Sequence, residues 1–98
     1  MTTKNYILSK KAQIHLNQIK EYTVEKFGSS QWNKYKKILI QGFETIATHS
    51  DIGIHCDDIL PNANRYKAGY HNVYFTIKEK EILIVAILSD YQLPENHL

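Results

Sequence analysis

The sequence predicts an α+β fold consisting of a strand, two helices and then a run of strands. Residues 10–46 repeat apolar side chains at helical spacing, whereas residues 71–78 alternate them at strand spacing and residues 81–88 form an apolar run of strand length. A chain of 98 residues is also too short to divide its apolar side chains between two cores. We therefore expect a single domain over residues 1–98.

The first half of the chain carries the predicted helices. The apolar run at residues 6–8 is expected to be a short strand, and Ser9 is suited to cap a helix over residues 10–27. Gly28 ends this helix, and Ser29 or Ser30 is suited to cap a second. So short a link implies an antiparallel hairpin. The apolar stripes are Ala12, Leu16, Ile19, Thr23 and Phe27, and then Trp32, Tyr35, Leu39, Phe43 and Ile46.

Four residues of the hairpin point away from these stripes. Ile14 lies among polar side chains, Ile38 lies off the second stripe, and Lys34 and Lys37 lie opposite it. Single exposed apolar residues are common, so this pattern is typical of an ordinary helix surface. The alternative is that these four residues contact a protein target.

The second half of the chain reads as strands after a loop at residues 50–64. Strands are expected over residues 65–68, 71–78 and 81–88. The last strand is apolar on both faces, which is typical of a strand covered on both sides. The helices cover one face, so the tail, another chain or both must cover the other. Ile82, Ile84, Ala86 and Leu88 are expected on one face, and Leu83, Val85 and Ile87 on the other.

The net charge of +2 is unevenly distributed. Residues 1–50 carry eight lysines and three glutamates, whereas residues 51–98 have a net charge of −3. A basic half can meet nucleic acid or an acidic protein segment, or it can be a solvated helix face. The N-terminus does not resemble a signal peptide, and no stretch is long enough to span a bilayer. We expect a cytoplasmic protein.

Several stretches, taken in order, resemble a known family. LSKKAQIHLNQIKEYTVEKFG resembles that family's first helix, and ATHSDIG is similar to the end of its second. RYKAGYHNVYF resembles its Arg-aromatic strand and the strand after it, and ILIVAIL followed by Pro94 resembles its last strand and tail. The family is the RelE/ParE superfamily of bacterial toxin–antitoxin toxins, and the resemblance is to its ParE branch.

The resemblance implies an antiparallel sheet packed on the helical hairpin, in the order β-α-α-β-β-β. It also implies a toxin that a small antitoxin neutralises by folding its disordered C-terminal segment over it, in a toxin–antitoxin hetero-oligomer. For ParE-like members the implied target is DNA gyrase, with no direct binding of nucleic acid required. For RelE-like members the target is messenger RNA on the ribosome. We expect the antitoxin on the second face of the last strand, at Leu83, Val85, Ile87 and Tyr91.

Cleaving RNA requires groups that activate the 2′-hydroxyl, stabilise the phosphate charge and protonate the leaving oxygen. The sequence has one arginine, Arg65, and Thr76 stands where the superfamily often has another. The lone His71 is better explained as a structural residue. We therefore predict a toxin without catalytic residues that blocks gyrase and replication. The alternatives are a ribosome-dependent messenger endoribonuclease, and an inactive toxin-like protein that still binds an antitoxin.

The loop contains the row His55-Cys56-Asp57-Asp58, whose side chains suit metal binding or nucleophilic chemistry. Neighbouring side chains in an extended segment point to opposite faces, so the four cannot easily converge on one ion. Zinc ligands are usually spaced apart, and the chain has no second cysteine. We predict no metal and no cofactor. Asp57 or Asp58 is expected to pair with Arg65 or a helix lysine as a structural clasp, with Cys56 tucked inward.

Overall fold

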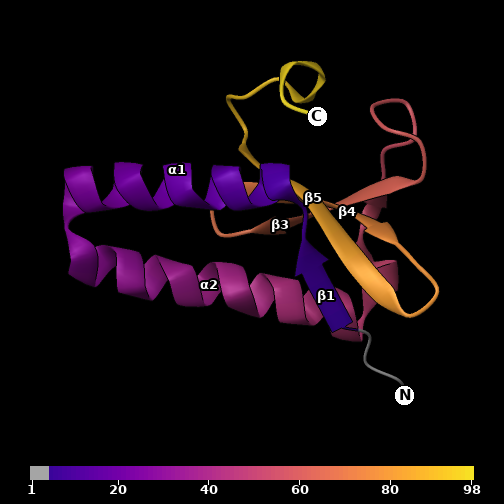
Figure 1. The fold of residues 1–98 in the computed structure, drawn as a ribbon, viewed down its shortest axis with the longest axis horizontal. Helices are drawn as coiled ribbons and strands as arrows, with labels where there is room; N and C mark the ends of the chain where they lie inside the picture. The colour runs from indigo at the N-terminus through magenta and orange to yellow at the C-terminus, as the bar shows by residue number, and fades with distance from the viewer. Residues whose placement is uncertain (1–4) are drawn as a thin grey trace.

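The computed structural model describes residues 5–98 as a helical hairpin packed on one sheet (Figure 1). Residues 1–4, part of the stretch compared with signal peptides, lie outside the described residues. The predicted α+β class is confirmed. The helices are α1 (Lys10–Phe27) and α2 (Ser29–Thr48), and the strands are β1 (Asn5–Leu8), β2 (Ile54–His55), β3 (Ala63–Ala68), β4 (His71–Ile77) and β5 (Glu81–Ser89).

The predicted bounds of α1 are confirmed, and local hydrogen bonds explain them. The predicted serine cap of α2 is wrong, because Gly28 is its N-cap and Ser29 already belongs to the helix. The Ser9 hydroxyl accepts the Ala12 N–H at 3.0 Å and so caps the start of α1. Gly28 adopts a φ of 91°, which other residues rarely adopt, and its N–H donates to the Val24 carbonyl. The chain therefore turns directly from α1 into α2. Neither helix within residues 5–98 is apolar enough over its length to cross a membrane.

The five strands lie in the order β1-β5-β4-β3-β2. Three of the four strand pairs are antiparallel, as the resemblance implies, but β1 runs parallel to β5, so the sheet is mixed. The two-residue strand β2 was expected to be part of a loop, and it pairs only with Arg65 and Asn64 of β3. A strand this short leaves too little sequence pattern to predict.

A β-bulge interrupts the pairing of β5 with β4. Tyr74 lies opposite Ala86 and Phe75 lies opposite Ile84, which leaves Val85 as an extra residue in β5. An extra residue shifts the side chains that follow it onto the other faces of the sheet. The strict alternation expected along β5 therefore ends at Val85.

The bulge exchanges the two faces of the second half of β5. Ile87 packs into the core beneath the helices and is only 1% exposed, so its predicted place on the opposite face is wrong. Ala86 and Leu88 were expected on the helix side, and they lie in a cluster on the opposite face instead. Leu83 and Val85 are half-buried.

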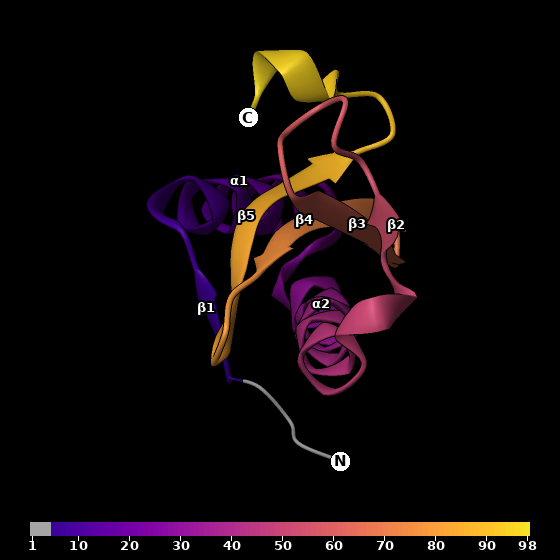
Figure 2. The same ribbon diagram turned by 90° about the vertical axis from the view of Figure 1, so that its right-hand side faces the viewer.

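The chain itself covers part of the opposite face of the sheet. Figure 2 shows the loop after β2 and the C-terminal tail above the end of β5. The tail was one of the expected covers, and it contributes Leu98. The loop contributes Cys56 and Leu60. The buried members of this cluster are Cys56, Ala63, Tyr74, Ala86 and Leu88.

The main core lies between the hairpin and the sheet. The stripe of α2 is buried there as predicted, but Phe27, the last member of the α1 stripe, is 66% exposed. Figure 1 shows the reason, because the tip of the hairpin extends beyond the edge of the sheet. The core comprises Ala12, Ile19, Trp32, Tyr35, Leu39, Phe43, Ile46, Ala68, Val73, Phe75, Ile82, Ile84 and Ile87.

The predicted clasp is wrong. No ion pair within residues 5–98 joins Asp57 or Asp58 to Arg65 or to a helix lysine. Asp57 instead accepts the backbone N–H of Asn62 at 3.0 Å, because a short acidic side chain readily bonds to the backbone of its own turn. Arg65 lies opposite Tyr74 in the pairing of β3 with β4. Cys56 is buried, as predicted, and burial raises the pKa of its thiol.

His15 closes the part of the β5 edge that β1 leaves uncovered. β1 ends at Leu8, which lies beside Ile84, and three residues further along β5 the Ile87 N–H donates to His15 Nδ1 at 3.2 Å. Burial, and then the nearby His97 and Lys11, lower the pKa of His15. The imidazole is therefore neutral, with its proton on Nε2.

This arrangement predicts a pH-dependent stability. Because the pKa of His15 in the folded chain lies below its ordinary value of 6.5, the unfolded chain takes up a proton more readily. The free energy of unfolding should therefore fall as the pH drops from about 7 to about 5. His15→Asn, which keeps an acceptor but cannot titrate, should reduce this fall in urea denaturation series.

The fall should not vanish in that variant, because burial also lowers the pKa of His71. The matched control is His49→Asn, which replaces an exposed histidine at the end of α2 and should keep the wild-type pH dependence. An unchanged pH dependence in His15→Asn would contradict the assignment.

Candidate functional site

A groove of about 770 Å³ lies between α1 and the end of β5. Its lining is mostly apolar and comes from both helices, the β3–β4 turn, β5 and the start of the tail. The lining residues are His15, Gln18, Ile19, Tyr22, Thr23, Phe27, Gln31, Tyr35, Tyr70, His71, Ile87, Ser89, Asp90, Tyr91 and Gln92.

One face of α1 forms the long wall of the groove. His15, Ile19 and Tyr22 recur at the spacing of one helix face, and Phe27 follows at its C-terminal end. From His15 to Phe27 this wall is roughly 18 Å long. His15 bonds the backbone of β5 and Ile19 is buried in the core, whereas Tyr22 and Phe27 are exposed, so the stripe continues beyond the buried core.

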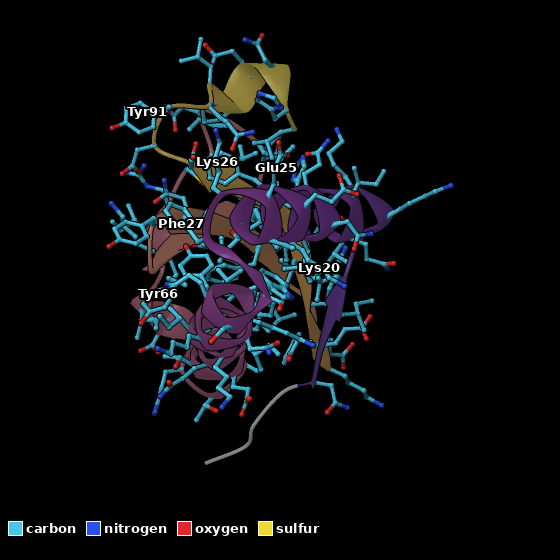
Figure 3. The ribbon with its side chains drawn as sticks, turned by 90° about the vertical axis from the view of Figure 1, so that its left-hand side faces the viewer. Lys20, Glu25, Lys26, Phe27, Tyr66 and Tyr91 are labelled. Atoms are coloured by element: carbon cyan, nitrogen blue, oxygen red, sulfur yellow. The ribbon has the colours of Figure 1, made fainter. Side chains whose placement is uncertain are left out.

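Four exposed aromatic side chains surround the groove, and we call them the aromatic rim: Tyr22, Phe27, Tyr70 and Tyr91. Their exposed fractions run from 59% to 97%. Figure 3 shows Phe27, at the end of α1, and Tyr91, on the tail, on the same side of the molecule. Exposed apolar side chains that gather around a groove are typical of a binding surface.

The inner end of the groove contains a fixed set of hydrogen bonds. The Tyr70 N–H donates to the Tyr35 hydroxyl at 2.9 Å, and that hydroxyl shares a short hydrogen bond with His71 Nδ1. Burial raises the pKa of Tyr35 and lowers that of His71, although Asp90 opposes the second shift. Both groups are therefore neutral at pH 7, and they hold the β3–β4 turn against α2.

Asp90 fixes the start of the tail at the rim of the groove. Its carboxylate accepts a hydrogen bond from Lys67 at 2.7 Å and one from Asn72 at 2.8 Å. These two bonds lower the pKa of Asp90. Because both ion-pair partners are more than half exposed, the pair orders the tail more than it stabilises the fold.

The chemistry of the groove suits binding. Asp90 is the one side chain with a formal charge among its described lining residues. Within residues 5–98, no three His, Cys, Asp or Glu side chains are grouped as a metal ion requires. Arg65 lies elsewhere, beside Tyr74, in a pair of residues that face each other across β3 and β4.

The residues predicted to bind the antitoxin lie in two places. Ile87 and Tyr91 line the groove, whereas Leu83 and Val85 are half-buried elsewhere on β5. The residues predicted to bind the target are all exposed on the hairpin, as expected, and none lines the groove. They are Ile14, Lys34, Lys37 and Ile38.

Sequence reasoning did not identify His15, Tyr22 and Tyr70 as groove residues. A signal was present for two of them, since His15 and Tyr22 are seven positions apart and share a helix face with Ile19. Tyr70 gave none, because a tyrosine in a turn indicates nothing about the helix that it approaches.

Comparison with known proteins identifies the family. The sequence-family model described as the ParE toxin of the type II toxin–antitoxin system parDE matches residues 6–94 of this chain. Two relatives, both Toxin ParE1 of Mycobacterium tuberculosis, from strains CDC 1551 / Oshkosh and ATCC 25618 / H37Rv, are each 31% identical over 87 residues. Each alignment covers 88% of this chain and 89% of the relative.

The fold has a solved counterpart. A chain of the chromosomal ParDE toxin–antitoxin system from P. aeruginosa superposes with a TM-score of 0.76 at 18% identity. The match covers 89% of this chain and 96% of that chain, which supports the fold alone. By its family match and its 31% identical relatives, this chain belongs to the ParE toxins of type II toxin–antitoxin systems.

Proposed function

We propose that this toxin stops growth by binding DNA gyrase, without catalysing a reaction itself, and that an antitoxin neutralises it by occupying the groove. Membership of the ParE toxins supports the assignment as a toxin and the expectation that an antitoxin is its partner. The observation that carries the proposed antitoxin site is the apolar groove with its aromatic rim. Gyrase and antitoxin would both meet the toxin in the cytoplasm.

The groove has dimensions that suit a segment of an antitoxin. A wall of roughly 18 Å accommodates about three turns of helix, or five to six residues of extended chain. The opposite face of β5, where the sequence led us to expect the antitoxin, is covered by Cys56, Leu60 and Leu98. We therefore move the proposed antitoxin site to the groove.

The proposed gyrase-binding surface is the outer side of the hairpin. Ile14 and Ile38 are each about half exposed there, with Lys34 and Lys37 also exposed. α1 carries both surfaces, because Ile14 lies on it as well as the groove wall. An antitoxin segment that leaves the groove across α1 would cover part of the proposed gyrase contact, and this would neutralise the toxin.

The endoribonuclease alternative receives less support from the described residues. Binding and cleaving RNA requires cations near the phosphate, and the described lining of the groove offers only the negative charge of Asp90. His71 is held neutral, with its Nδ1 already bonded to Tyr35. Mapping messenger 5′ ends after toxin induction separates the two functions, because an endoribonuclease would cut within codons.

The first prediction concerns gyrase. Purified toxin should block supercoiling by gyrase or trap its cleaved-DNA complex, and Lys34→Glu combined with Lys37→Glu should weaken this effect by about tenfold, because reversed charges oppose docking. Lys80→Glu, on the β4–β5 turn, is the matched control and should act like the wild type. If folded toxin in excess leaves supercoiling unchanged, gyrase is not the target. Growth arrest during induction would then still separate an active toxin from an inactive one that only binds its antitoxin.

The second prediction concerns the antitoxin. Tyr22→Ser combined with Phe27→Ser should weaken binding of the cognate antitoxin by about 10- to 100-fold in calorimetric titrations, since exposed aromatic anchors dominate interfaces. The fold should be retained, because both side chains are mainly exposed. Leu83→Ser combined with Val85→Ser is the comparison on the other face. A loss of affinity in that variant, with full affinity in the rim variant, would return the antitoxin to the opposite face of β5.

A further inference from the structure

We propose that the groove selects its partner by a basic side chain, arginine or lysine, that enters between the aromatic rings close to Asp90. This inference rests on the proposal that the groove receives the antitoxin, and it states which chemistry the bound segment must carry.

The first argument is the number of aromatic rings that share the groove. Tyr35 and Tyr70 are stacked, with ring centroids 6.2 Å apart and ring planes inclined by 19°. Tyr22, Phe27 and Tyr91 line the same groove. The faces of such rings carry partial negative charge and attract an ammonium or guanidinium group. A planar guanidinium can also stack on them.

The second argument is the charge of the groove. Asp90 lines it, whereas Lys67, which pairs with Asp90, does not. The two histidines of the lining do not repel a cation, because each has its Nδ1 engaged in a hydrogen bond and burial keeps each of them neutral. The groove is thus locally suited to a cation, although the hairpin around it is rich in lysine.

The third argument is the cost of covering Asp90. A wholly apolar segment in the groove would remove water from this carboxylate without giving it a new donor, which opposes binding. An arginine or lysine supplies donors, and its aliphatic stem packs along apolar wall residues such as Ile19 and Ile87. One side chain then meets both the apolar and the charged part of the groove.

A peptide selection on the immobilised full-length toxin tests this proposal without requiring the antitoxin or gyrase. Random 16-residue peptides are selected on the wild type, with counter-selection on Tyr70→Leu to discard peptides that bind elsewhere. We expect one position of the selected peptides to be enriched in arginine or lysine. Replacing that residue by methionine should weaken binding by about 3- to 30-fold.

A double-mutant cycle then locates the contact. Asp90→Asn should weaken binding of the basic peptide but not of its methionine variant, whereas the tail control Glu95→Gln should affect neither. Selected peptides without basic enrichment, equal effects of Asp90→Asn on both peptides, or no binding that depends on Tyr70 would each overturn the inference. Gyrase inhibition is measured separately, so its failure would leave these results standing, and their failure would leave gyrase inhibition standing.

Discussion

The need to cover β5 on both edges and both faces shapes the rest of this structure. β4 pairs along one edge, but β1 pairs along the other only as far as Ile84. The Ser9 N–H donates to the Ile84 carbonyl and the Ser9 hydroxyl to the Val85 carbonyl, so the chain enters α1 directly against β5. His15 then takes the Ile87 N–H. Buried backbone groups need such partners, and here a helix side chain replaces a missing strand.

The same constraint creates the groove. Because the bulge at Val85 turns Ile87 toward the helices, the end of β5 supplies an apolar floor beneath α1. The helix continues past that floor, so its apolar face remains open from Tyr22 to Phe27. An exposed apolar face beside a groove is typical of a surface that a partner covers.

The sequence predicted the elements whose signals are local. Ser9 and Gly28 determine the ends of α1 through hydrogen bonds within a few residues, and the apolar β5 correctly indicated a strand covered on both faces. The bulge could not be predicted, because residues 82–88 are all apolar and their pattern marks no extra residue, while the irregularity arises from pairing with β4.

The groove was missed for a related reason. Its rim joins Tyr22, Tyr70 and Tyr91, which come together only when the hairpin, the β3–β4 turn and the tail are in place. The prediction of the clasp was wrong because it assumed a distant partner. Asp57 instead accepts a hydrogen bond from a backbone N–H only five positions away. The family resemblance identified the class of toxin, whereas the groove can be seen only in the folded chain.

The pairing of β1 with β5 also has a consequence for synthesis on the ribosome. The hydrogen bond from Ser9 to Val85 joins residues 76 positions apart, so the first strand has no partner until nearly the whole chain has emerged. Such distant pairing is slow to form, and the hairpin must wait with its apolar faces uncovered. A chain released early by the ribosome lacks β5, and with it the residues that β5 contributes to both core clusters. Completion of both cores therefore depends on residues that the ribosome adds near the end of synthesis.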